Sequence, residues 1–446
     1  MLKLTRIPFV WLCLLALPSP AVTLEEFQRV KKRVPEQVNA QQTDWHLYRT
    51  RVIEAWKLFP NRVPGSGVTI AVPDTGLYPH PELTREGQFI PEILMDEGYD
   101  FYRDRKPALD ELNEWSIAIP QGHGTSVTAL LVSPPDADPV AGSEAWPVTG
   151  VVPGAKVLPL RVQPSVLLTD GERLGKALRY AIDKKVDVIS ISMGGLFFDR
   201  RLEQLLQEAE QLGIIVVAAG GQGIPEIIYP ASSQHVIAVA ASDAADRAWS
   251  ATSSGAKILV SAPGNGVWYA GASRANADEP VAISVRQGQG TSFAAPLVAG
   301  AAAMWLSYHG RESLLKKYGG AGLVRVFKHL VMRQATNKID DWDSFRFGLG
   351  VIDYEKLLKA PLPYLAPEIP GGFRIDPFGL ANFAYRGRYE SRGISGYINF
   401  CFDWLQDGRD VTPILEAAKQ AGDLWEKPDS AFRDTLRLQI DGLCES

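Results

Sequence analysis

Cysteine is scarce in this chain, with 3 residues among 446, and histidine is almost as rare, with 6. This scarcity excludes a disulfide-rich scaffold and a zinc or iron–sulfur centre built on clustered cysteines. Outside the triad proposed below, the histidines do not have the spacing of a metal site. We interpret them as structural or exposed residues: His46, His80, His235, His309 and His329.

Positive charge is not in excess either, since 46 lysines and arginines face 51 aspartates and glutamates and give a formal net charge of -5. That balance offers no electrostatic basis for binding nucleic acid or an anionic membrane surface. Apolar runs are short as well: neither Ile7–Leu17 nor Phe293–Tyr308 reaches the roughly 20 residues of a membrane-spanning helix. With 46% hydrophobic residues the chain can still bury a large core, and we expect one large domain with appendages.

The first residues have the composition of an export signal. Lys3 and Arg6 precede the apolar run, and Pro18–Ala21 supplies the small residues of a signal-peptidase site. We predict that residues 1–21 are a signal peptide, cleaved after Ala21 on export to the periplasm or the medium. An uncleaved anchor is the alternative.

Short β-rich runs alternate with helical patterns through the middle of the chain. The runs are continuous enough to be buried on both faces, and they are Val68–Val72, Lys156–Val162, Val186–Ile191, Ile214–Ala218 and Val236–Ala240. Apolar residues recur at helical spacing over 174–182, behind a predicted N-cap at Asp170, and over 202–209. This succession predicts an α/β fold of three layers, with a mostly parallel central sheet and helices on both faces.

Three short motifs each supply a side chain for nucleophilic catalysis. Asp74 begins an Asp-Thr-Gly motif after the first predicted strand, and His123 begins a His-Gly-Thr motif. Ser292 lies in a Gly-Thr-Ser-Phe-Ala-Ala-Pro motif at the start of a predicted buried helix over 293–308. A serine hydroxyl needs a base within hydrogen-bond reach and a third group that orients that base. We therefore predict a triad with Ser292 as nucleophile, His123 as general base and Asp74 holding the imidazole.

The order Asp, His, Ser and the flanks of these residues resemble the subtilisin-like serine peptidases, the subtilases (peptidase family S8). Tyr78–Leu83 resembles the family's His-Pro-Asp-Leu turn, and Val188–Gly195 resembles its substrate-flanking strand. Ser261–Gly264 resembles its Ala-Pro-Gly turn, and Gly348–Asp353 resembles its closing segment. The resemblance implies a subtilisin-like fold and a peptidase domain over residues 44–360.

The resemblance also implies where a substrate and the oxyanion bind. Two segments would line the cleft and hold an extended peptide by backbone pairing: Ser190, Ser192, Met193, Gly194 and Gly195 in the first, and Ala218, Ala219 and Gly220 in the second. The backbone N–H of Ser292, at the positive end of the helix, would stabilise the oxyanion.

Two positions depart from the family pattern. Where the family carries an asparagine that donates to the oxyanion, this chain has Gly221, and the next residue, Gln222, carries the same amide on a longer side chain. We hypothesise that Gln222 substitutes for the asparagine if the loop shifts; the alternative is a weakened oxyanion site. Pro73, directly before Asp74, either removes a hydrogen bond from a central strand or lies just past the last pairing residue.

Both ends of the chain lie outside the resemblance. Residues 22–43 form a short N-terminal segment, so we expect no full-length inhibitory pro-domain. Relatives use structural calcium, but no stretch here matches a calcium loop convincingly. Residues 361–446 begin with a proline-rich linker and continue into two predicted helices, a small C-terminal extension that is either an accessory module or a stabilising cap. In an oxidising compartment Cys401 and Cys444 would form a disulfide within it; two unpaired thiols are the alternative.

These observations predict an exported serine endopeptidase that hydrolyses peptide bonds through an acyl-enzyme and requires no cofactor for the chemistry. Its partner is a protein or peptide substrate. Two alternatives stay open: a catalytically attenuated subtilisin-like binding module, motivated by Gly221, and a peptide ligase or acyl transferase in which an amine resolves the acyl-enzyme. The sequence indicates neither the subsite preference nor the oligomeric state.

Overall fold

The computed structural model describes residues 43–113, 121–135, 147–276, 278–333, 336–337 and 342–363. The predicted signal peptide and almost all of the short N-terminal segment lie outside these residues. So does the predicted C-terminal extension beyond residue 363, with Cys401 and Cys444.

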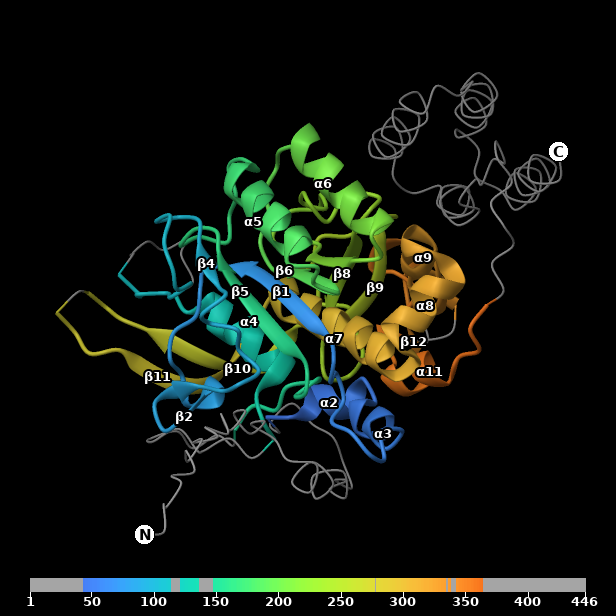
Figure 1. Cartoon of the computed structure of the whole chain (residues 1–446), viewed down its shortest axis with the longest axis horizontal. Coiled ribbons are helices and arrows are strands. Elements are labelled where there is room, and N and C mark those ends of the chain that lie inside the picture. The colour runs from blue at the N-terminus through green and yellow to red at the C-terminus, as the bar shows by residue number, and fades with distance from the viewer. Residues whose placement is uncertain are drawn as a thin grey trace, which may run out of the picture.

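Parallel strands form the centre of the described structure (Figure 1). The strands span Thr69–Asp74 (β1), Thr84–Arg85 (β2), Gln88–Phe89 (β3), Tyr99–Asp100 (β4), Lys156–Arg161 (β5), Val188–Ile191 (β6), Ile215–Ala219 (β7), Ile237–Ser242 (β8), Ile258–Pro263 (β9), Asn265–Ser273 (β10), Ala282–Gln289 (β11), Thr336–Asn337 (β12) and Val351–Ile352 (β13). Within the described residues the main sheet has the order β12-β13-β9-β8-β7-β6-β1-β5-β4. All its neighbouring pairs are parallel except β12 with β13. The mostly parallel α/β sheet predicted from the sequence is confirmed.

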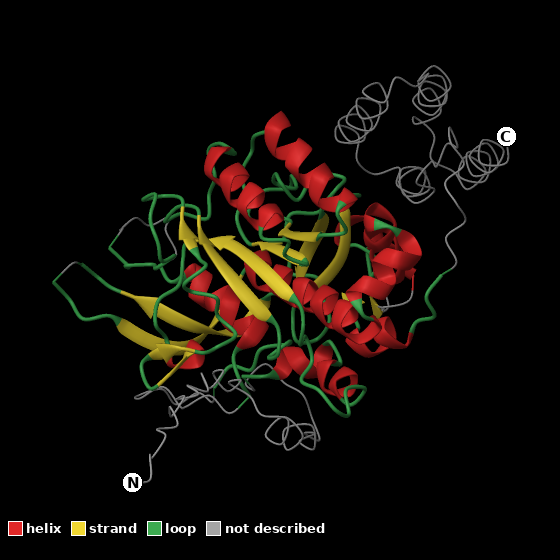
Figure 2. Cartoon of the chain, viewed as in Figure 1, coloured by secondary structure: helices red, strands yellow, loops and turns green. Residues whose placement is uncertain are grey.

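Helices cover both faces of this sheet (Figure 2). They span Trp45–Arg49 (α2), Val52–Trp56 (α3), His123–Val132 (α4), Glu172–Asp183 (α5), Arg200–Gln211 (α6), Thr291–His309 (α7), Arg311–Tyr318 (α8), Gly320–Arg333 (α9), Ser344–Phe347 (α10) and Tyr354–Lys359 (α11), and a short 3-10 helix spans Pro81–Leu83 (η1). α5 and α6 pack on one face, and α4 and α7 pack on the other. A separate antiparallel hairpin, β10 and β11, lies against α4.

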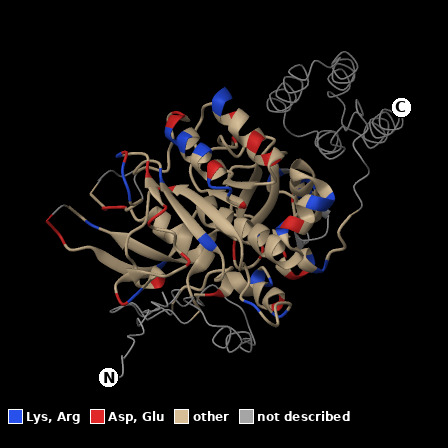
Figure 3. Ribbon diagram, in the orientation of Figure 1, with Lys and Arg blue, Asp and Glu red and all other residues tan. Residues whose placement is uncertain are grey.

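The two outer helices are amphipathic, whereas α7 is buried along most of its length. Leu174 and Leu178 of α5 and Leu202 and Leu206 of α6 face the sheet, as the helical spacing predicts. Charged residues of both signs alternate on their outer sides (Figure 3). None of the helices in the described ranges combines the length and the apolar character that crossing a bilayer requires.

The prediction of Asp170 as the N-cap of α5 is wrong by one position. The N-cap is Gly171, which has no side chain to offer. The Asp170 carboxylate nevertheless accepts a hydrogen bond from the N–H of Glu172 at 3.0 Å, so it satisfies an N–H of the first turn from one residue further out.

The winding of the chain reverses at β1. Because β1 lies between β5 and β6, the chain proceeds to one side of β1 before it returns to the other. Ligands of such sheets bind at the carboxyl ends of the strands that flank this point. Asp74 ends β1, and Ser192 follows the end of β6, so the predicted site residues lie at this point of the sheet.

Candidate active site

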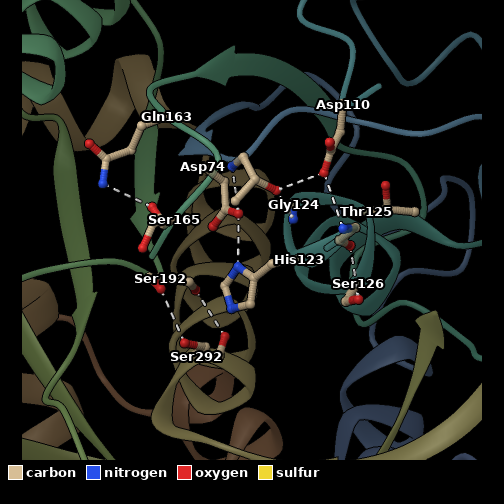
Figure 4. A network of polar contacts seen from close by, with 12 residues as sticks. Asp74, Asp110, His123, Gly124, Thr125, Ser126, Gln163, Ser165, Ser192 and Ser292 are labelled. Carbon is tan, nitrogen blue, oxygen red and sulfur yellow. Dashed lines mark hydrogen bonds and ion pairs between the residues drawn. The ribbon is translucent and has the colours of Figure 1, made fainter. Parts of the chain in front are cut away.

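Asp74 and His123 meet at the carboxyl end of β1 (Figure 4). Asp74 is the last residue of β1 and His123 is the first residue of α4. Both side chains are buried, and the Nδ1 atom of His123 lies 2.8 Å from Oδ1 of Asp74. The same oxygen accepts the N–H of Thr75 at 2.8 Å. A carboxylate at Nδ1 selects the imidazole tautomer whose Nε2 is free to accept a proton.

A buried network behind this pair holds β1 and α4 together. Oδ2 of Asp110 accepts hydrogen bonds from the Thr75 hydroxyl at 3.3 Å and from the N–H of Gly122 at 3.1 Å. The Thr75 hydroxyl oxygen in turn accepts the N–H of Gly124 at 3.0 Å. Glycine is required at Gly124, because a Cβ there would lie 2.2 Å from the carbonyl oxygen of Gly76. The strand end and the helix start can therefore approach closely enough for the Asp74–His123 contact.

Pro73 lies inside β1 without removing a hydrogen bond to β5. The carbonyl of Val68 accepts from the first residue of β5 and that of Asp74 from the residue just after β5, whereas the carbonyl of Thr69 accepts from the residue before β6. Backbone groups alternate in direction along a strand, so the ring nitrogen of Pro73 faces β6. The pairs between β1 and β6 end at Ala71. On that side, Pro73 is past the last pairing residue, but it is still paired in register with Leu160 of β5. The proline therefore lies inside the strand, as in the first placement that the sequence left open, yet it removes no hydrogen bond to β5.

Ser292 occupies the first turn of α7 and is held there by Ser192. Pro296 stands four residues after Ser292 in the helix and has no N–H to donate to the Ser292 carbonyl. The Ser192 hydroxyl donates to that carbonyl instead, at 2.9 Å. The N–H of Ser292 belongs to the first turn, whose N–H groups have no partner within the helix. The sequence Ser-Phe-Ala-Ala-Pro thus leaves the Ser292 carbonyl without a donor from the helix backbone, and Ser192 in the loop after β6 supplies one.

The hydroxyl of Ser292 donates to the backbone carbonyl of Ser192, at 3.1 Å. Figure 4 shows the second imidazole nitrogen of His123 on the side of Ser292. Among the described residues, no hydrogen bond joins that nitrogen to the Ser292 hydroxyl. The three predicted residues are therefore brought to one place, with the Ser292 hydroxyl bonded to Ser192.

A family model described as the subtilase family matches residues 65–350, well over half of the chain. The chain belongs to the subtilase family. Subtilisin BL of Lederbergia lenta is 30% identical over 274 residues, which cover 59% of this chain and 84% of that protein. The cell wall-associated protease of Bacillus subtilis (strain 168) is 29% identical over 235 residues, covering 51% of this chain and only 23% of that protein.

Two solved structures share the fold of this subtilase. A protease of Pseudoalteromonas arctica aligns with a TM-score of 0.55 and 22% identity, covering 71% of this chain and 98% of that one. Fervidolysin of Fervidobacterium pennivorans, described as a keratinolytic enzyme related to subtilisin, aligns with the same TM-score and identity. The alignment covers 74% of this chain and 48% of the fervidolysin chain. The family predicted from the sequence motifs is confirmed.

The loop after β7 contains Gly221, the residue predicted to stand where the family usually has asparagine. Gly221 has a φ of +106°, and a Cβ there would lie 2.9 Å from the Ser253 hydroxyl oxygen. Both the backbone conformation and the available space therefore disfavour a side chain at this position. The N–H of Gly221 donates to the Thr291 hydroxyl at 3.2 Å, which ties this loop to the start of α7.

Gln222 reaches the start of α7 with its side chain. Its Oε1 accepts the N–H of Thr291 at 2.9 Å, and because an N–H can bond only to the oxygen, this contact decides the orientation of the amide. Nε2 makes no hydrogen bond within the described part of the chain. A Cβ built on Gly290 would lie 3.2 Å from Oε1 and 3.5 Å from Nε2 of Gln222, and 3.7 Å from the nitrogen of Ser292. The Gln222 amide and the nitrogen of Ser292 therefore both lie beside Gly290.

The residues predicted to line the cleft fall into two groups. Ser190, Ala218 and Ala219 lie in buried strands and pair within the sheet, and Gly220 pairs with the carbonyl of Val239. Ser192, Met193, Gly194 and Gly195 follow the end of β6, and Ser192 is the member of this group that contacts Ser292.

His80 and Glu82, in the turn that resembles the family's His-Pro-Asp-Leu motif, are buried and hydrogen-bonded within the protein. Burial lowers the pKa of His80 to about 4, and its Nδ1 accepts the N–H of Glu82 at 3.1 Å. Burial raises the pKa of Glu82 to about 7. Its carboxylate accepts the Ser133 hydroxyl at 2.5 Å and the N–H of Val148 at 2.9 Å.

The remaining histidines have separate surroundings. His46 is buried, and His235 lies 2.5 Å from a carboxylate oxygen of Glu210. His309 contacts the ring of Trp305. In the described ranges no three side chains of His, Cys, Asp or Glu are grouped so that they could hold a metal ion.

Sequence reasoning missed three residues that position the site. Thr75 and Thr291 stand next to Asp74 and Ser292 in the motifs, so their adjacency was a usable signal. Asp110 had none, because it is separated from His123 along the chain and reaches the site only through the fold.

Proposed function

We propose that this subtilase is a serine endopeptidase. Ser292 attacks the peptide carbonyl, His123 takes the proton and returns it to the leaving amine, and Asp74 holds the imidazole and stabilises its charged form. The observation that carries this proposal is the buried 2.8 Å contact of Asp74 with His123 beside a serine in the first turn of α7. Water then resolves the acyl-enzyme on Ser292.

Two N–H groups are proposed to stabilise the oxyanion, the backbone N–H of Ser292 and Nε2 of Gln222. Both flank the space beside Gly290, and the first also lies at the positive end of α7. Thr291 supports this role for Gln222, since its N–H holds Oε1 and leaves Nε2 as the free end of the amide.

Export remains a prediction from the composition of residues 1–21, and the substrate is proposed to be an extended protein or peptide chain. Curated relatives carry names such as alkaline protease and thermophilic serine proteinase, in line with this substrate class.

A fluorophosphonate probe tests the proposal, because it reacts only with a serine that has a working base and oxyanion site. The purified protein is treated with the probe, and the added mass is sought on the peptide that contains Ser292. We expect labelling of the wild type and none of Ser292→Ala. His123→Ala is expected to abolish labelling too, with folding checked by circular dichroism.

One observation favours a catalytically attenuated binding module instead. The Ser292 hydroxyl donates to the Ser192 carbonyl and not to His123. If this contact persists, the serine is not activated. A folded wild-type protein that the probe fails to label would refute the first function, and binding of a peptide by that protein would then support the second.

A further inference from the structure

The backbone edge beside Ser292 is already paired within the chain. After β6, the N–H of Gly194 donates to the carbonyl of Val166 at 3.0 Å, and the carbonyl of Gly194 accepts the N–H of Leu168 at 2.9 Å. Gly195 faces the opposite way and pairs in both directions with Tyr229. Because backbone groups alternate along an extended segment, Ser192 and Gly194 share one edge. By the resemblance to the subtilases, this is the edge predicted to pair with a peptide near Ser292.

The third polar group on this edge, the Ser192 carbonyl, is occupied as well. The carbonyl of Ser192 accepts the hydroxyl of Ser292. Two residues further along, both polar groups of Gly194 are taken by Val166 and Leu168. An extended peptide therefore finds the Ser192 carbonyl and both backbone groups of Gly194 already engaged in hydrogen bonds.

The segment paired with Gly194, residues 163–168, is here named the strap. Its conformation is held by the side chain of Gln163, whose Nε2 donates to the carbonyls of Ser165 at 3.1 Å and Leu167 at 2.8 Å. The Ser165 hydroxyl oxygen accepts the N–H of Leu167 at 3.1 Å. Figure 4 shows Gln163 and Ser165 on the same side of the site as Ser192.

The outer edge of the strap does not offer a substitute for Gly194. Both backbone groups of Leu167 are engaged within the strap, by Gln163 and Ser165. A peptide cannot extend the sheet at Leu167 without breaking these contacts, so access to the edge beside Ser292 requires the strap itself to move.

We propose that the strap closes the peptide-pairing edge of Gly194 and that an extended substrate must displace it. This inference rests on the proposed function. On displacement, Gly194 exchanges Val166 and Leu168 for the backbone groups of the peptide. A peptide N–H that bonds to the Ser192 carbonyl competes with the Ser292 hydroxyl and frees it to turn toward His123. Binding of an extended chain thereby completes the triad, whereas a small ester gains nothing from this exchange.

The displacement is energetically modest. Two backbone hydrogen bonds to Gly194 are replaced by two from the substrate, so the exchange at Gly194 is nearly balanced. The side chain of Leu167 is already 59% exposed, so little apolar surface is uncovered there. Leu168 is only 5% exposed, so its side chain anchors the end of the strap in the core.

Gln163→Ala weakens the closed strap without touching the proposed triad or the oxyanion donors. When only the open form binds, the apparent dissociation constant equals the intrinsic one divided by the fraction of open protein. A larger open fraction therefore lowers KM. We expect KM for an N-blocked tetrapeptide anilide to fall at least about fivefold, the equivalent of one of the two hydrogen bonds that the substitution removes. The rate with a small p-nitrophenyl ester should not change. Gln204→Ala, an exposed glutamine on α6, is the matched control.

Hydrogen exchange of Ser292→Ala with an N-blocked tetrapeptide amide tests the displacement without turnover. The N–H groups of Leu168 and Gly194 should both exchange slowly in the free protein. With the peptide bound, Leu168 should exchange faster, while Gly194 stays protected by its new partner.

The outcomes separate this inference from the proposed function. Three results would each overturn the strap proposal. The first is continued protection of the Leu168 N–H with peptide bound, and the second is an equal KM for Gln163→Ala and the wild type. The third is a protein that the fluorophosphonate labels but that does not bind the peptide. If the probe labels no serine and neither substrate is hydrolysed, the proposed function itself has failed, and the strap proposal fails with it.

Discussion

Replacing Gln222 by alanine removes one of the two donors that the structure places beside Gly290. The anchor on the Thr291 N–H is lost with it, but the backbone N–H of Ser292 stays. In subtilisin itself, the type example of this effect, loss of one side-chain donor to the oxyanion lowers kcat by about 10²- to 10³-fold. The side chain of Gln222 is exposed, so water can partly replace it. We therefore expect kcat to fall by about 100-fold, the lower end of this range, which corresponds to roughly 2.7 kcal/mol of activation free energy.

The loss should fall on kcat and leave KM nearly unchanged, because the donor acts on charge that develops only in the transition state. Steady-state hydrolysis of the tetrapeptide anilide measures both constants. Gln222→Glu distinguishes the loss of the hydrogen-bond donor from a change in the position of the loop. A glutamate oxygen can still accept the Thr291 N–H, but the side chain has no N–H to donate to the oxyanion. Its added negative charge should make the loss at least as large as that of alanine.

Gln204→Ala again serves as the exposed control. A Gln222→Ala variant whose kcat stays within about threefold of the wild type, while Ser292→Ala is inactive, would refute the assignment of the second donor to Gln222.

Three further predictions follow from the same contacts. Asp74→Asn should lower kcat about 10⁴-fold, because an amide at Nδ1 of His123 favours the wrong tautomer; a loss below about tenfold in the anilide assay would contradict the proposed role. Gly221→Asn should not raise kcat and should lower the free energy of unfolding by about 1–3 kcal/mol, measured by urea denaturation, because its φ of +106° and the Ser253 hydroxyl oppose a side chain. Glu82 has a folded pKa of about 7 against an ordinary value of 4.5, so the folded state holds its proton more tightly and loses stability as pH rises between these values. Relative to Glu82→Gln, the free energy of unfolding of the wild type should fall by up to about 3 kcal/mol between these two pH values and not fall further above them. If the melting temperatures of the two proteins change with pH in the same way, this prediction is wrong.

Much of the central fold could be predicted from local patterns. β1, β5, β6, β7 and β8 appear within one or two residues of the predicted runs, because strands buried on both faces read as continuous apolar segments. The hairpin of β10 and β11 was not predicted, since its alternation of buried and half-exposed residues is irregular.

The sequence by itself determined which side chains carry the proposed chemistry. Asp74, His123 and Ser292 each lie in a short local motif, and their order along the chain identifies the family. Such motifs are readable because the turn or helix start that presents each side chain is built from adjacent residues.

Only the tertiary structure decided how these residues are supported and what covers them. The contacts of Asp110 with Thr75, of Ser192 with Ser292 and of Gly194 with the strap join segments far apart in sequence. The φ of Gly221 and the reach of Gln222 depend on how the loop after β7 packs against the start of α7. Local propensity carries no record of such pairings, since each depends on where the sheet places the two segments.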